Sequence, residues 1–207
     1  MKKLITLVVC VFFILSTAQV SDALTYKFEE NILGVPFQAT MEINVSKNVL
    51  TINFDNTSPE SYGPTIWGFG VGLKNFYEII GGGLNKEFTA GGKDVTKNWS
   101  RPGFPEYPFY FLANSDRNDS LFNPKSKQFD SGSNSFTPAT FVITFLGGDP
   151  ILDESIMPII RVGGSAFSSS NTPLITKGNL VATPEPGTLL LMGIGLIGIA
   201  LVMREML

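Results

Sequence analysis

Hydrophobic and polar residues alternate in the middle of the chain. From Ala39 to Val45 every second residue is apolar, and the residues between them are polar. The alternation stops at residues 46–48 and resumes from Leu50 to Asp55. A period of two is typical of a strand with one buried face. Residues 37–55 therefore predict a β-hairpin with its turn at 46–48.

Further strands are predicted at 65–73 and 140–146, and shorter ones at 157–162 and 180–182. The strand at 65–73 carries Gly68, Gly70 and Gly72 on one face, so we expect a bulge there or the close approach of a backbone or a ring. Trp67 and Phe69 lie on the other face and are expected in the core. The strand at 140–146 is apolar enough on both faces to be central in its sheet.

The fold class predicted from these patterns is all-β. No window outside the two ends of the chain gives an amphipathic helix, and 21 Gly and 13 Pro interrupt the sequence frequently. Short strands separated by turn residues favour an antiparallel β-sandwich, jelly-roll or Ig-like. Long irregular loops are expected at 81–106, 113–135 and 147–156, and a single apolar helix is expected near the C-terminus.

The first residues have the pattern of a secretory signal peptide. Lys2 and Lys3 precede an apolar segment over residues 4–15, and Ser21 and Ala23 form a small-x-small site. Cleavage after Ala23 is the prediction, with cleavage after Ala18 as the alternative. The mature chain is then expected to begin at residue 24 and to be exported.

The other end carries a second targeting pattern. Pro184, Glu185 and Pro186 precede an uncharged apolar run over 189–203, and Arg204 follows. Residues 193–198 match the Gly-x-Gly-x-x-Gly dinucleotide motif, but we interpret them as small residues of a membrane helix. The run is about 22 Å long as a helix, against a hydrocarbon core of about 30 Å, which suits a transient insertion better than a permanent anchor. These residues resemble the PEP-CTERM sorting signal of bacterial exported proteins.

The resemblance implies a route and partners for the protein. It implies export by the secretion machinery, membrane insertion through the C-terminal helix, and recognition by an exosortase, a membrane transpeptidase. Delivery to the surface of a Gram-negative cell would follow, often in connection with exopolysaccharide and biofilm. Arg204 stands beside Glu205 where the family has a basic cluster, which affects how this end is held in the cytoplasm. The expected division is signal peptide 1–23, β-sandwich 24–170, spacer and motif 171–186, and sorting tail 187–207.

The chemistry available to the mature segment is limited. Removing both ends takes three basic and two acidic residues from the chain's 15 and 18, which leaves a net charge of −4 and disfavours nucleic acid as a partner. The chain contains no His, and Cys10 is its only Cys. Ser-His-Asp and Cys-His catalysis and His-based zinc sites are thereby excluded, and no cofactor is expected. We expect a non-catalytic surface or matrix protein. The alternative is a secreted carbohydrate-active enzyme that uses two carboxylates, supplied from Glu78, Glu87, Asp94, Glu106, Asp149, Asp153 and Glu154.

Two segments suggest ligand sites. Aromatic residues crowd residues 99–111, and Trp99, Tyr107 and Tyr110 are the candidates for stacking against sugar rings. Packing of these rings inside the protein is the preferred interpretation. A second segment, with Asp116, Asn118 and Asp119, is rich in oxygen ligands for Ca²⁺, but it lacks the Gly and Glu of an EF-hand loop, and an Asx-rich turn is the preferred interpretation.

Overall fold

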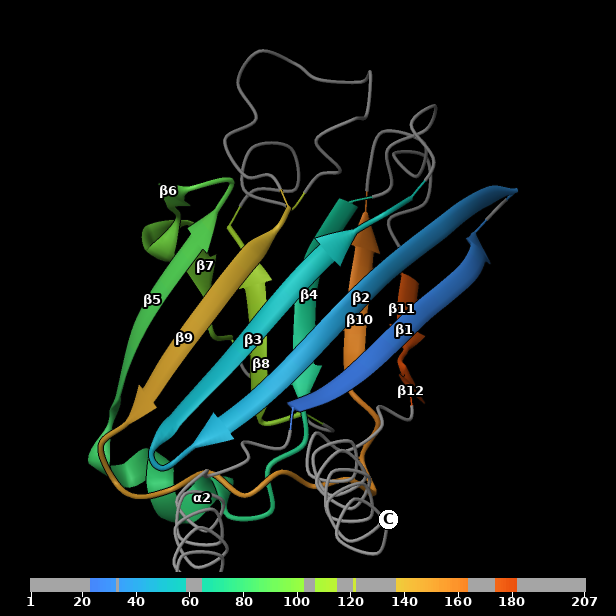
Figure 1. Cartoon of the computed structure of the whole chain (residues 1–207). Coiled ribbons are helices and arrows are strands. Elements are labelled where there is room, and N and C mark those ends of the chain that lie inside the picture. The colour runs from blue at the N-terminus through green and yellow to red at the C-terminus, as the bar shows by residue number, and fades with distance from the viewer. Residues whose placement is uncertain are drawn as a thin grey trace, which may run out of the picture. The chain divides into compact units, whose positions relative to one another are not determined.

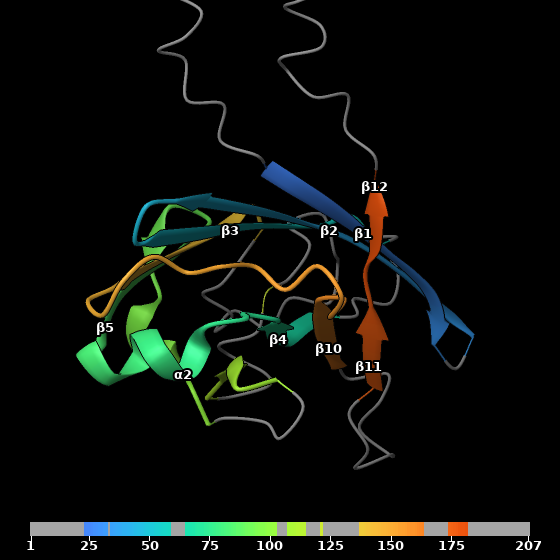
Figure 2. The same cartoon turned by 90° about the horizontal axis from the view of Figure 1, so that it is seen from below.

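The fold is given by a computed structural model, which describes residues 23–32, 34–58, 65–102, 107–114, 121, 137–163 and 174–181. All of these residues belong to one compact unit, Ala23–Ala182. Its strands form two antiparallel sheets packed face to face, which confirms the predicted sandwich (Figures 1 and 2).

Seven strands form the larger sheet, in the spatial order β12-β1-β2-β3-β9-β5-β6, and five form the smaller one, in the order β11-β10-β4-β8-β7. The elements of the larger sheet are β1 Ala23–Ile32, β2 Val35–Ser46, β3 Val49–Asn56, β5 Leu84–Ala90, β6 Lys93–Asp94, β9 Ala139–Phe145 and β12 Asn179–Val181. Those of the smaller sheet are β4 Thr65–Val71, β7 Trp99–Ser100, β8 Phe109–Ala113, β10 Ile159–Gly163 and β11 Leu174–Lys177. Three short helices complete the unit, α2 Phe76–Ile79, η1 Ile80–Gly82 and η2 Thr96–Asn98.

The predicted hairpin is confirmed as β2 and β3. Ser46 pairs with Val49 across a two-residue turn, and the pairing continues to Ala39 opposite Asn56. Lys47, the first residue of the turn, has a φ of 51°, which suits the twist of a short hairpin connection. The strand β9 lies between β3 and β5 and is central in its sheet, as its apolar sequence predicted.

The core consists of the inward side chains of both sheets and is dominated by phenylalanine. Phe141 on β9 is fully buried at its centre. Its ring centroid lies 4.3 Å from that of Phe88, 4.9 Å from Trp99, 5.0 Å from Phe69 and 5.4 Å from Phe54. Rings from both sheets therefore interlock around one residue, and such aromatic pairs stabilise a fold beyond the area they bury.

The prediction of an irregular loop at 81–106 is wrong, because this segment contains β5, β6 and β7. The inward positions of β5 are Leu84, Lys86, Phe88 and Ala90, so a lysine interrupts the apolar period. The Lys86 ammonium group donates a hydrogen bond to the Trp99 carbonyl oxygen on β7. The lysine thus links one sheet to the other at this side of the sandwich, and burial lowers its pKa.

The predicted spacer 171–186 is also wrong over residues 174–181, where the short strand predicted at 180–182 is confirmed as β12. Residues 174–177 pair with β10 in the smaller sheet, and residues 179–181 pair with β1 in the larger one. Figure 2 shows this segment passing from one layer to the other. Gly178 permits the passage, because a Cβ there would lie 2.7 Å from Cζ of Phe28. The segment preceding the sorting motif is therefore part of the sandwich.

The short helical turn of α2 and η1 lacks any sequence pattern long enough to predict it. The loop predicted at 147–156 is irregular apart from a single bridge between Leu73 and Leu152. In the described part of the chain, no helix combines the length and hydrophobicity needed to cross a membrane. The expected C-terminal helix lies outside the described residues, as does most of the loop predicted at 113–135.

Candidate functional site

The outer face of the smaller sheet brings together the chemistry most suited to a ligand. Antiparallel partners share a face, so the register places Lys177, Ile159, Gly70 and Tyr110 in one row across β11, β10, β4 and β8. The adjacent row consists of Ile175, Arg161, Gly68 and Leu112. We call these two rows, together with Tyr107 and Trp67, the β10–β11 face.

The glycines of β4 form a trough beneath the tyrosines of this face. A Cβ on Gly68 would lie 2.6 Å from the Tyr110 hydroxyl, and one on Gly70 would lie 3.1 Å from Cβ of Tyr107. The distance at Gly68 is shorter than real Cβ atoms show, and the distance at Gly70 is tight, so glycine at these positions lets the rings lie against the sheet. The close approach of a ring, expected from the glycine pattern, is confirmed. A register irregularity at Arg161 and Val162, opposite this part of β4, also confirms the expected bulge.

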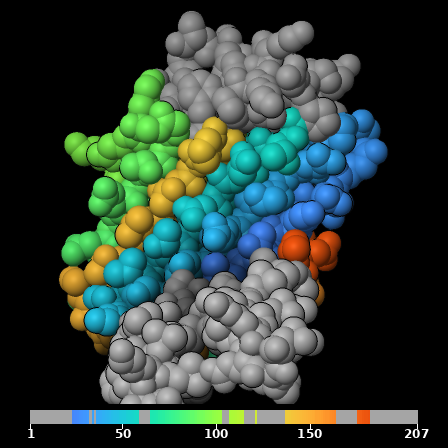
Figure 3. Space-filling view, viewed as in Figure 1, coloured from blue at the N-terminus to red at the C-terminus, as the bar shows by residue number. Residues whose placement is uncertain are grey.

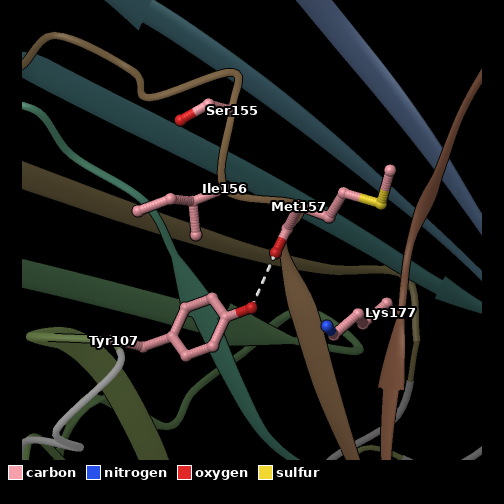
Figure 4. A pocket seen from close by; sticks show the side chains of 5 residues that line it. All are labelled: Tyr107, Ser155, Ile156, Met157 and Lys177. Atoms are coloured by element: carbon pink, nitrogen blue, oxygen red, sulfur yellow. Dashed lines mark hydrogen bonds between the residues drawn. The ribbon is translucent and has the colours of Figure 1, made fainter.

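A pocket of about 430 Å³ opens at one end of the face. It is lined by Tyr107, Ser155, Ile156, Met157 and Lys177. The Tyr107 hydroxyl donates a hydrogen bond to the Met157 carbonyl oxygen at 3.0 Å, which fixes the ring at the pocket wall (Figure 4). The Lys177 side chain extends toward the same space, and the Met157 side chain is 52 % exposed. The pocket thus combines a cation, hydroxyl groups and apolar walls.

Arg161 occupies the middle of the face and stacks on an aromatic ring. The carbon of its guanidinium group lies 4.2 Å from the ring centroid of Trp67, a cation–π geometry. Trp67 is partly buried and packs against the core, so the prediction that it lies in the core with Phe69 is confirmed for Phe69 and only in part for Trp67. The irregularity in the β4–β10 register accounts for this, because it interrupts the strict alternation of faces.

Three polar atoms in and around Arg161 have no hydrogen-bond partner. They are Nε of Arg161, Nε1 of Trp67 and Oγ1 of Thr65, and all three are buried. Thr65 pairs with Gly163, and a Cβ on that glycine would lie 3.8 Å from Oγ1 of Thr65 and 3.6 Å from Cβ of Trp67. The three groups therefore gather around one end of β10. Buried polar atoms without hydrogen-bond partners are costly, and Nε1 of Trp99 in the core is another of them.

The ionisable groups next to the face are partly engaged already. Burial raises the pKa of the Tyr110 phenol, while the neighbouring Arg161 guanidinium opposes this increase. Asp153 accepts hydrogen bonds from the Ser155 hydroxyl at 2.6 Å and from its backbone N–H at 3.1 Å, and these bonds lower its pKa. Asp153 is therefore a fixed negative charge beside the pocket, whereas Lys177 and Arg161 are the positive charges of the face.

The outer face of the larger sheet has a different character. Its outward positions are mainly Thr, Asn, Gln and acidic residues. Figure 3 shows the strands of this face side by side. Thr140 donates a hydrogen bond to Asn53 at 2.9 Å, and Asn53 donates one to Glu42 at 3.2 Å. These bonds join three strands through their side chains and leave a polar, solvated surface without aromatic platforms among the described residues.

The aromatic segment predicted as a glycan-binding candidate packs inside the protein. Trp99 is 1 % exposed, Tyr110 2 % and Tyr107 7 %. Trp99 belongs to the core, and the two tyrosines cover the glycine trough on the other side of the sheet. The prediction that these three rings form a platform for stacking against sugars is therefore wrong, because their faces are occupied by protein atoms.

The other predicted site residues have separate outcomes. Ala23, the predicted cleavage residue, is the first residue of β1. The predicted Ca²⁺ site, with Asp116, Asn118 and Asp119, lies outside the described residues and stays a prediction. Within the described ranges, no cluster of three potential metal ligands occurs. The carboxylates weighed for catalysis are distributed over α2 (Glu78), β5 (Glu87), β6 (Asp94) and the loop before β10 (Asp149, Asp153, Glu154), while Glu106 lies outside the described residues.

Sequence reasoning overlooked Arg161 and Lys177. A signal for Arg161 existed, because a lone cation interrupts the apolar run of β10, Ile159 to Val162. Lys177 gave no signal, since exposed lysines are common. Only the pairing of β10 with β11 places these two side chains on one face.

The class of protein follows from the sandwich together with its two ends. Thr25, near the start of β1, pairs directly with Val181, the last residue of β12, so the predicted signal peptide and the sorting tail join the domain at neighbouring positions. Residues 182–204 match the family model described as the PEP-CTERM protein-sorting motif. Pro184, Glu185, Pro186 and Arg204 lie within this match, outside the described residues.

The matched motif marks the protein as exported to the cell surface and processed by an exosortase. Neither the curated proteins nor the solved structures contain a match to this chain. The matched motif covers residues 182–204 and says nothing about the function of the sandwich. That function is therefore inferred from the surfaces of the sandwich.

Proposed function

We propose that this protein is a non-catalytic component of the cell surface or extracellular matrix whose sandwich associates with exopolysaccharide, in a biofilm setting. The observation that carries the proposal is the sorting motif placed directly after the last strand of a compact β-sandwich. A domain delivered in this way acts outside the cell, where polysaccharide is an abundant partner. The β10–β11 face supplies the hydroxyl groups, the cations and the apolar walls that a saccharide contacts.

The absence of catalysis is part of this proposal. It is supported by a sequence without His and with its only Cys, Cys10, in the predicted signal peptide. Release of reducing ends from any polysaccharide that the protein binds would overturn this part and favour the carbohydrate-active enzyme.

Intact mass of the protein from the cell surface and the medium tests the sorting step. We expect a chain that begins near Leu24 and ends near Pro186. Replacing Pro184 and Pro186 with Ala should retain the tail, whereas Pro36→Ala, an exposed proline on β2, should be processed normally. A wild-type mass that keeps residues 187–207 would contradict processing and indicate a tethered domain instead.

A further inference from the structure

Arg161 and Lys177 place two positive charges on one face of an acidic domain. They lie on paired strands at diagonal positions, since Ile159 pairs with Lys177 and Arg161 pairs with Ile175. Diagonal neighbours in an antiparallel pair have Cα atoms about 7–8 Å apart. Among the residues that the structure describes, neither cation forms an ion pair with a carboxylate.

The environment of Arg161 favours an anionic group with two oxygen atoms. Its stack on Trp67 fixes the plane of the guanidinium group, whose Nε is buried, so a ligand would meet the group through its terminal nitrogen atoms. A planar guanidinium group matches the two oxygens of a carboxylate, and such bidentate bonds are short and strong. Lys177 carries its charge on a flexible stem and can follow a ligand along the face.

We propose that the β10–β11 face binds acidic polysaccharide, with sugar carboxylates held by Arg161 and Lys177. The inference rests on the proposed function and specifies its ligand class. One uronate carboxylate lies against the Arg161 guanidinium group. A neighbouring sugar enters the pocket, where the Lys177 ammonium group binds its carboxylate and the Ser155 hydroxyl faces its hydroxyl groups. Ile156 and Met157 provide the apolar contact.

The two faces of the sandwich favour this choice of surface. The larger sheet presents Glu42, Asp55 and Glu87 outward, with Lys27 as a basic residue among them, so it repels a polyanion. On the β10–β11 face the pocket lining contains Lys177 and no carboxylate among the described residues, while Asp153 and Glu154 lie in the adjoining loop. Electrostatic attraction thus selects the face and sets the orientation of the polymer, and it weakens with added salt.

The test uses the full chain purified in mild detergent, with polygalacturonate as the acidic probe and dextran as the neutral one. We expect binding to polygalacturonate and at least tenfold weaker binding to dextran. Lys177→Met should weaken polygalacturonate binding by about tenfold, as loss of a charge-assisted contact does. Arg161→Lys should also weaken it, because lysine keeps the charge but lacks the planar fork. Raising the salt concentration should weaken binding by the wild-type chain.

Lys27→Met is the matched control, because Lys27 is an exposed strand lysine on the opposite face. It changes the net charge as Lys177→Met does and should leave the affinity unchanged. Equal losses of affinity in Lys177→Met and Lys27→Met would show that only the overall charge matters, and would overturn the proposed site. Equal binding of dextran and polygalacturonate would overturn the ligand class while leaving a polysaccharide-binding protein. Binding to neither probe, by protein that is correctly sorted, would overturn the inference and the polysaccharide part of the proposed function, but leave the sorting intact.

Discussion

Phe141 should carry more of the stability of the sandwich than any neighbour on its strand. It is fully buried, and four rings from both sheets lie with centroids 4.3 to 5.4 Å from its own. Replacing Phe141 with Ala removes these contacts and leaves a cavity that the surrounding rings cannot fill. Such substitutions cost about 3–5 kcal/mol. Domains of this size are stable by about 5–15 kcal/mol, so the variant should fold but be much less stable.

Val142 provides the matched control, since it follows Phe141 on β9 but points to the outer face and is half-buried. Val142→Ala should cost less than about 1 kcal/mol, because strand substitutions on a solvated face have small effects. Urea denaturation of the Ala23–Ala182 segment, followed by tryptophan fluorescence, measures both values. Trp99 is a direct probe, because its ring lies edge-on to Phe141 at 4.9 Å.

The expected shift in melting temperature for Phe141→Ala is a decrease of about 6–20 °C, from 2–4 °C per kcal/mol in a domain of this length. A loss below about 1 kcal/mol, or equal losses for Phe141→Ala and Val142→Ala, would refute the central role of this ring cluster. If Phe141→Ala does not fold, Phe141→Leu should still give a measurable loss, since it keeps part of the packed volume.

Two further predictions concern the pairing of β1 with β12 at the edge of the larger sheet and the effect of pH. Cysteines at Thr25 and Val181 should form a disulfide that raises the stability by about 2–4 kcal/mol, because these residues are direct partners. Cysteines at Thr25 and Leu180 should not form a disulfide, because Leu180 points to the other face of the sheet. Equal cross-linking of both pairs on non-reducing gels would show that this register is wrong. Burial raises the pKa of Tyr26 and Tyr110 above 10.0, so the folded state holds these protons more tightly than the unfolded state. The contribution of these two phenols to the stability of the fold is complete below pH 10, and it is lost as the pH rises through their raised pKa values. Ultraviolet titration should therefore show phenols that ionise late, and titration of all phenols with the unfolded chain would contradict this.

The sandwich could be predicted in outline wherever the apolar period is unbroken. The hairpin of β2 and β3 and the strand β9 follow the alternation of their sequences, whereas β4 and β10 were predicted from apolar runs whose alternation is interrupted by a register shift. The strand β5 escaped prediction because Lys86 holds an inward position, where its ammonium group finds the Trp99 carbonyl oxygen. A lysine in the core-facing row is stable only through a partner far along the chain, and no local pattern reveals that partner.

The candidate site was predicted in part. The glycines of β4 predicted the close approach of a backbone or a ring, and in the structure the rings of Tyr107 and Tyr110 lie against them. The same tyrosines were also candidates for sugar stacking, which their burial excludes. Whether an aromatic residue is exposed depends on what packs over it, and composition alone does not determine this.

The sequence by itself determined the route of this protein, because targeting signals are linear. The predicted signal peptide and the matched Pro-Glu-Pro motif are patterns of composition and order along the chain, and neither needs a folded context to be recognised. Tertiary structure decided which residues can meet a ligand outside the cell. Arg161 and Lys177 become neighbours only through the pairing of β10 with β11, and Trp67 supports the guanidinium group only because the β4–β10 register shifts beside it. Strand pairing joins residues that are distant in sequence, so the face exists only in the folded chain.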